Sequence, residues 1–150
     1  MQRFVALQLG VTILFAALVV VVFGRDDEDA LWWVAAALVL VVFLAAALVS
    51  RWWSRAAPLA PDEPAPEHTA MRRLSSHIAR AFVVLEIPLV AAAVLGLVGV
   101  LGGASMLVPV LAAVTALGFG TWPTRRNVDR FATALERDGA RSGIREAFAQ

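Results

Sequence analysis

Residues 31–49 read LWWVAAALVLVVFLAAALV, a run without one charged or strongly polar side chain. At 1.5 Å per residue, a helix of this length spans about 29 Å, close to the ~30 Å hydrocarbon core of a bilayer. Asp29 lies just before the run and Arg51 just after it. The segment therefore predicts a membrane-spanning helix with a charged residue beyond each end.

Three further apolar runs of similar length lie at residues 4–23, 80–101 and 104–122. The chain of 150 residues is 60% hydrophobic and 17% charged, and its mean hydropathy is +0.75. This composition excludes a water-soluble globule and a disordered chain. The first run is too long for the apolar part of a signal peptide and has no cleavage site, so we expect a retained anchor. The sequence thus predicts an all-α integral membrane protein with four transmembrane helices.

Short connections divide the four predicted spans into two helical hairpins. Residues 24–30 join the first pair, and Gly102 and Gly103 join the second. Between the hairpins lies a predicted linker, residues 50–79, whose Pro/Ala-rich first half has little to bury and is expected to be extended and mobile. Its second half, from residue 69, has apolar residues at helical spacing and should lead as a helix into the third span. The whole chain is interpreted as one membrane domain.

Arginine supplies all 13 basic residues and is unevenly distributed about the predicted spans. Placing the N-terminus, the linker and the C-terminal tail on one side collects twelve arginines and leaves only Arg25 opposite. The positive-inside rule then places both termini in the cytoplasm. The lack of lysine and the abundance of Ala, Val and Leu are typical of a GC-rich coding sequence. We therefore expect a multi-pass protein of a bacterial inner (plasma) membrane.

The five tryptophans all fall near the ends of predicted spans. They are Trp32, Trp33, Trp52, Trp53 and Trp122. Amphipathic indole rings prefer the headgroup level of a bilayer, so these residues are interpreted as an aromatic belt.

The C-terminal tail, residues 123–150, contains a predicted amphipathic helix that is too short and too polar to span. Val128, Phe131, Ala132 and Leu135 form one apolar stripe. Ile144, Ala147 and Phe148 form a second, shorter stripe. We expect the tail to lie on the cytoplasmic membrane surface. Docking on a partner protein and simple solvation are the alternatives.

Glu86 is an ionisable residue inside a predicted span, where a charge is expensive. It lies about 9 Å beyond Arg80, which marks the cytoplasmic end of the third span. Gln8, Thr12 and Thr115 fall at similar depths on the other spans. In a functional interpretation, these four side chains face one another around a small cavity that binds a substrate or a proton, with Glu86 as the protonatable centre.

A structural interpretation of Glu86 is the alternative. The side chain reaches the interface or pairs with Arg125 or Arg126, and the threonines bond to their own helix carbonyls. In that case, Glu86, Gln8, Thr12 and Thr115 bind neither a substrate nor a proton.

Small residues predict close packing between the third and fourth spans. On the third span they are Gly96 and Gly99, continued by Gly103, and on the fourth they are Ala112, Ala116 and Gly120. Glu86 lies about 100° around its helix from this glycine face at 100° per residue. Its side chain should therefore point toward the other hairpin, toward lipid or toward another subunit.

The sequence offers no catalytic residues, metal site or cofactor site. There is no cysteine, no nucleophile with a base and an orienting group, and no phosphate-binding glycine loop. His68 and His77 have no metal-ligand spacing, and the four carboxylates at 26–29 match no calcium loop. The arginine clusters lie near membrane ends, so they indicate anionic headgroups as partners and not nucleic acid.

These features favour a non-catalytic accessory or scaffold subunit of a membrane complex, which holds a protein partner or a second copy of itself. The alternative is a small oligomeric transporter or proton-linked permease that uses Glu86. A third hypothesis is an enzyme whose chemistry comes from a bound lipid or cofactor.

The arginine distribution makes a topology prediction. A reporter that is active only in the cytoplasm should give signal when fused after Gln150. A reporter that is active only outside should give signal within residues 26–29. A silent cytoplasmic reporter at the C-terminus would overturn the orientation.

Overall fold

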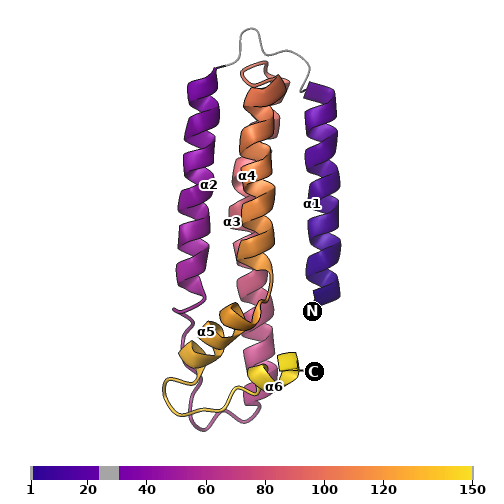
Figure 1. The fold of residues 1–150 in the computed structure, drawn as a ribbon. Coiled ribbons are helices and arrows are strands. Elements are labelled where there is room, and N and C mark those ends of the chain that lie inside the picture. Colours follow the sequence, from indigo (N-terminus) through magenta and orange to yellow (C-terminus); the bar gives the residue numbers. More distant parts are fainter. Residues whose placement is uncertain (1, 24–30, 150) are drawn as a thin grey trace.

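A computed structural model describes residues 2–23 and 31–149 (Figure 1). All regular structure in these two ranges is helical, and they contain no strand. The helices are α1 (Gln2–Phe23), α2 (Trp32–Trp52), α3 (Pro66–Leu97), α4 (Gly103–Thr121), α5 (Arg125–Leu135) and α6 (Ile144–Ala149). The first four are long and apolar enough to cross a membrane, which confirms the prediction of an all-helical protein with four candidate spans.

Helix α4 lies at the centre of the bundle and packs against α1, α2 and α3. Helix α3 also contacts α1 and α2. In Figure 1, α1 and α2 stand on opposite sides of the α3–α4 pair. The connection of the first predicted hairpin, residues 24–30, is outside the described residues.

Helix α3 differs from the predicted third span at both ends. It begins at Pro66, where a missing backbone N–H is tolerated, and Glu67 in its first turn complements the helix dipole. It ends at Leu97, and Val100 then donates its N–H to the carbonyl of Leu95 at 2.9 Å. The helical lead-in predicted from residue 69 is present and is continuous with the span. Its 32 residues measure about 48 Å, so α3 extends well beyond a ~30 Å hydrocarbon core.

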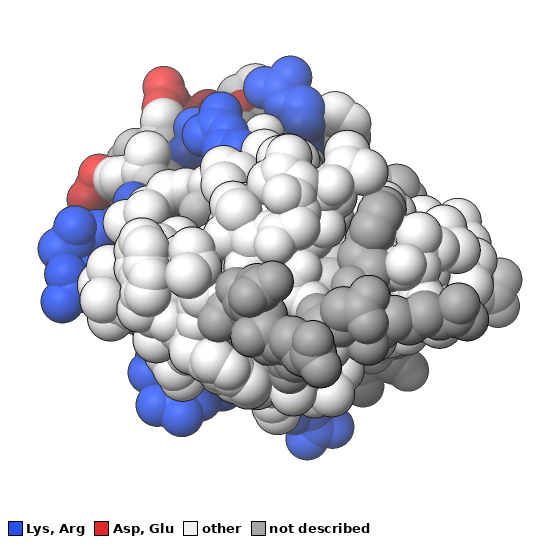
Figure 2. All heavy atoms as spheres, turned by 90° about the horizontal axis from the view of Figure 1, so that it is seen from above, with Lys and Arg blue, Asp and Glu red and all other residues white. Residues whose placement is uncertain are grey.

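The four long helices bury two apolar clusters, one of which contains Phe82, Leu85 and Leu117, and turn another apolar surface outward. Leu38, Val42, Leu89, Met106 and Val110 belong to the larger of these two clusters. Leu14, Leu18, Phe43, Leu44 and Phe119 are among the exposed large side chains. Seen from the end opposite α5 and α6, arginines appear only toward the margins of the described surface (Figure 2). An apolar exterior on helices of this length fits a lipid environment.

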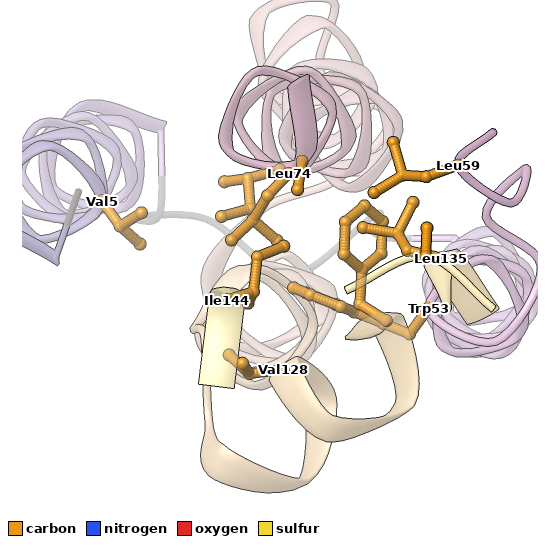
Figure 3. Close-up of a cluster of buried hydrophobic side chains, with 11 residues drawn as sticks. Val5, Trp53, Leu59, Leu74, Val128, Leu135 and Ile144 are labelled. Atoms are coloured by element: carbon orange, nitrogen blue, oxygen red, sulfur yellow. The ribbon is translucent and has the colours of Figure 1, made fainter. Parts of the chain in front are cut away.

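Residues 123–149, here named the cap, fold back against the first half of α3 (Figure 3). Helix α5 follows Pro123 and is N-capped by Thr124, whose Oγ1 accepts from the Asn127 N–H at 3.2 Å. A third buried cluster joins the cap to the rest of the chain. Its members are Val5, Trp53, Leu59, Ala70, Leu74, Ile78, Val128, Phe131, Leu135, Ala140 and Ile144.

The expectation that the tail lays its apolar stripe on the membrane or on a partner is wrong. Val128, Phe131, Ala132 and Leu135 are all buried within the chain itself. Leu74 and Ile78 on α3 form a matching apolar face, so the two stripes cover each other. Of the second stripe, Ile144 is buried in the same cluster, whereas Ala147 is exposed.

The linker expectation is also wrong in one respect, because its first half does bury a side chain. Leu59 is fully buried, and its backbone N–H donates to the carbonyl of Leu135 at 2.8 Å. Arg73 Nη1 donates to the carbonyls of Ala57 and Pro58 at 2.7 and 3.1 Å. These contacts fix the path of the linker on the cap and on α3.

Trp53 departs from the predicted aromatic belt. It is 1% exposed, and its Nε1 donates to the carbonyl of Gly120 at 3.1 Å. Trp32 and Trp33 are exposed, whereas Trp52 is half-buried. Trp53 therefore joins the end of α2 to the end of α4 and does not present its ring to surrounding headgroups.

Candidate functional site

Glu86 meets a side chain from the first helix. The Thr12 hydroxyl on α1 donates to Glu86 Oε1 on α3 at 3.0 Å. Thr12 is 4% exposed and Glu86 is half-buried. Of the three directions that the sequence left open, the carboxylate takes the one toward the other pair of spans. A hydrogen bond between two partly or fully buried side chains stabilises the contact between α1 and α3.

Gln8 lies one turn before Thr12 on the same face of α1. Its Oε1 is buried and has no hydrogen-bond partner in the described part of the chain. A buried acceptor without a partner carries a desolvation cost. Gln8, Thr12 and Glu86 therefore supply polar groups near the contact between α1 and α3, and Gln8 Oε1 is able to accept a further hydrogen bond.

Thr115 does not join these groups. It is exposed on α4, although it lies at a depth similar to that of Glu86. Arg125 and Arg126 are also exposed, and neither forms an ion pair with Glu86 among the described residues. The polar partner of Glu86 is thus Thr12 and not one of the arginines considered from the sequence.

The predicted packing residues have different roles in the structure. A Cβ added to Gly120 would lie 2.6 Å from Leu85 Cδ1, so this glycine permits a close approach of α3 and α4. Gly96 is buried, and the half-buried Ala112 and Ala116 pack against the bundle core.

Gly99 and Gly103 shape the turn between α3 and α4 and not their seam. Their φ angles are +74° and +47°, a region that glycine adopts without strain. A Cβ added to Gly99 would meet nothing within 4 Å.

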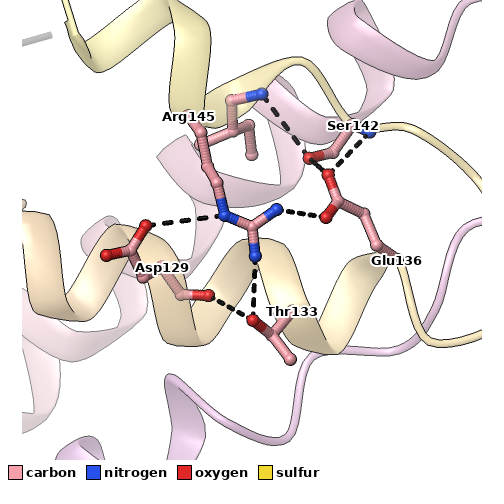
Figure 4. A network of polar contacts seen from close by, with 6 residues as sticks. Asp129, Thr133, Glu136, Ser142 and Arg145 are labelled. Carbon is pink, nitrogen blue, oxygen red and sulfur yellow. Dashed lines mark hydrogen bonds and ion pairs between the residues drawn. The ribbon is translucent and has the colours of Figure 1, made fainter.

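A polar network that the sequence did not reveal ties α6 to α5 (Figure 4). The Arg145 guanidinium pairs with Glu136 and with Asp129, and its Nη2 donates to Thr133 Oγ1 at 2.9 Å. Ser142 donates to Glu136 Oε1 from its hydroxyl at 2.6 Å and from its backbone N–H at 3.1 Å. The network closes the segment between the two helices and holds Ile144 in the buried cluster.

The charge of Glu136 is favoured by this network. Partial desolvation raises the pKa of its carboxyl, but the hydrogen bonds from Ser142 and Arg145 outweigh that effect, so the pKa is lower than usual. A lowered pKa in the folded state means that this stabilisation is present above the unfolded pKa. It is lost as the pH falls through the folded pKa.

Metal ligation has no structural support in the described ranges. They contain no group of three or more His, Cys, Asp or Glu side chains that could hold an ion. The acidic residues 26–29 lie outside these ranges, so the predicted absence of a metal or cofactor stays a prediction.

Comparison with known protein families, with curated proteins and with solved structures finds no match to this chain.

The Glu136 network predicts a pH-dependent stability. Glu136→Gln keeps the shape but removes the charge, and should lower the stability of the cap by about 1 kcal/mol at neutral pH, because the pair is partly exposed. The difference should vanish at a pH where the wild-type carboxyl is also protonated. Hydrogen exchange of the Ile144 amide in detergent micelles would measure it. Glu146→Gln, at an exposed carboxylate of α6, is the control, and an equal effect of both variants at every pH would contradict the network.

Proposed function

We propose that this chain is a small multi-pass protein of a bacterial inner membrane that acts as a non-catalytic accessory or scaffold subunit of a membrane complex. Its spans form two hairpins with both termini on the cytoplasmic side. Its partners are anionic headgroups and either another membrane protein or a second copy of the chain.

The packing of the cap on α3 carries this proposal. Leu74 and Ile78 lie on the same continuous helix that enters the bundle, so the cap has a fixed direction relative to the spans. The outward side of the cap is charged. Arg126, Arg137, Asp138, Arg141 and Glu146 are exposed there. A fixed, charged surface attached to apolar helices suits a subunit that positions a partner at the membrane.

The distribution of arginine supports the proposed orientation. Every arginine whose side chain is described lies near the end of α2, in the first half of α3 or in the cap. These elements meet at one end of the molecule, where N and C also lie in Figure 1. A cluster of basic residues at one end favours the cytoplasmic side for that end.

The scaffold proposal predicts that a partner depends on the cap. Full-length protein crosslinked in membranes and purified in mild detergent should carry one stoichiometric partner, whose mass tells a second copy from another protein. Phe131→Ala removes a buried ring and should destabilise the cap by about 3–5 kcal/mol. The partner should then be lost while the long helices remain.

Two further variants separate a loss of the partner from a general loss of folding. Phe119→Ala, at a ring that is 78% exposed on α4, should retain the partner. Arg137→Glu changes the outer surface of the cap without touching its core and should weaken the complex even if Phe131→Ala fails to fold. A wild-type protein that stays a lone monomer in membranes and in detergent would contradict the proposal.

A transporter is the second candidate, and the contact between Thr12 and Glu86 favours it. A carboxylate and a hydroxyl joined between two helices, beside the unpartnered oxygen of Gln8, could exchange a proton as the helices move.

The transporter alternative predicts a proton flux that depends on Glu86. Proteoliposomes with a pH gradient and an enclosed pH-sensitive dye should show flux with the wild type and none with Glu86→Gln, which retains hydrogen bonding but not the ionisable group. Glu146→Gln should behave as the wild type. Absence of wild-type flux, or full flux with Glu86→Gln, would exclude this alternative.

A further inference from the structure

A basic cavity of about 370 Å³ lies where the end of α2, the turn after it, α3 and the cap meet. Its lining includes Trp52, Arg55, Arg73, His77, Arg80 and Phe131. No Asp or Glu contributes to this lining. Arg80 precedes the apolar part of α3, so the cavity lies at the level of the proposed membrane surface.

The spacing of residues along α3 explains why three of the lining side chains lie together. Arg73, His77 and Arg80 stand at i, i+4 and i+7, which places them on one face of the helix. Arg55 comes from the turn after α2 and adds a third guanidinium. Three like charges around one cavity repel one another unless an anion lies between them.

The protein supplies no counter-charge within the described residues. Arg55, Arg73 and Arg80 form no ion pair there, and Arg73 uses only Nη1 for the two linker carbonyls. The other guanidinium N–H groups of Arg73 can still donate.

His77 contributes its ring to the wall of the same cavity. Its ring lies against Trp53 and Phe131, with centroid distances of 4.5 and 5.3 Å. Its Nε2 is buried and has no hydrogen-bond partner in the described part of the chain. A bound acceptor could therefore receive hydrogen bonds from the arginines, beside an aromatic wall to which the His77 ring belongs.

An adjoining apolar groove indicates what kind of anion fits. A second cavity, of about 380 Å³, shares Trp52, Ser76 and Arg80 with the first and continues along α3 to Val83 and Val84. These valines belong to the apolar part of α3, and Val83 is 61% exposed. A molecule that fills both cavities has an anionic head and an apolar chain.

We propose that the two cavities bind one anionic phospholipid, with its phosphate between Arg55, Arg73 and Arg80 and an acyl chain along Val83. Inorganic phosphate shares the head chemistry but cannot fill the groove. This site rests on the proposed membrane location and on anionic headgroups as partners, but it needs no protein partner, so its test can fail without any consequence for the scaffold role.

Native mass spectrometry of the full chain released from lipid nanodiscs tests the site. From nanodiscs of mixed phosphatidylglycerol and phosphatidylcholine, the wild type should retain one phosphatidylglycerol in preference to phosphatidylcholine. Arg80→Gln should weaken this retention about tenfold, as expected for the loss of one charge-assisted hydrogen bond. Arg55→Gln, on the opposite side of the cavity, should weaken the retention of phosphatidylglycerol by a similar factor. Arg72→Gln, at an exposed residue outside the lining, should leave this retention unchanged.

Filling the groove separates a lipid from free phosphate. Val83→Trp should reduce phosphatidylglycerol retention, and excess inorganic phosphate should not displace the lipid from the wild type. Equal retention of the two lipids, equal behaviour of the Arg80 and Arg72 variants, or no effect of Val83→Trp would overturn the proposal. Thermal melting of each variant verifies that a loss of lipid comes from the site and not from unfolding.

Discussion

The burial of Phe131 and Leu135 against Leu74 and Ile78 couples the cap to the helices of the bundle. This contact exists because α3 is about 18 Å longer than a ~30 Å hydrocarbon core needs, so its first half projects as an apolar face. Water would otherwise cover that face and the stripe on α5, and covering both at once removes apolar surface from each. This contact also fixes the path of the linker, because Leu59 packs into the same cluster and its backbone N–H donates to the carbonyl of the last residue of α5.

The sequence predicted the features that depend on local pattern. Four apolar runs of span length predict four long helices, since each run has to satisfy its own backbone in lipid. The stripe on α5 was also visible, and so was the helical spacing of Leu74 and Ile78. The contact between these two apolar faces was not predicted. An amphipathic pattern identifies an apolar face but does not say which surface buries it. Two stripes assigned to the same side of the membrane could have been matched to each other.

For the polar residues, position along a predicted span gives the depth in the membrane but not the direction in which the side chain points. Glu86, Thr12 and Thr115 lie at comparable depths, yet only Thr12 faces the carboxylate and Thr115 is exposed. The rotation of each helix about its axis depends on packing, which a single sequence does not contain. Arg73 and Arg80 share a helix face by spacing alone, whereas the approach of Arg55 depends on the turn after α2. The burial of Trp53 was missed for the same reason, because its partner is a carbonyl of α4.

The contact at Glu86 and the basic cavity differ in how many of their polar groups find a partner within the protein. At Glu86 the carboxylate already accepts a hydrogen bond from Thr12, so the chain provides a partner for its charge. At the basic cavity three guanidinium groups converge without a carboxylate, and a buried imidazole nitrogen beside them has no partner. Uncompensated like charges destabilise a fold, and a bound anion removes that penalty. The balance of satisfied and unsatisfied groups therefore makes the basic cavity the stronger candidate for ligand binding, whereas the contact at Glu86 is compatible with a structural role and with the transporter alternative.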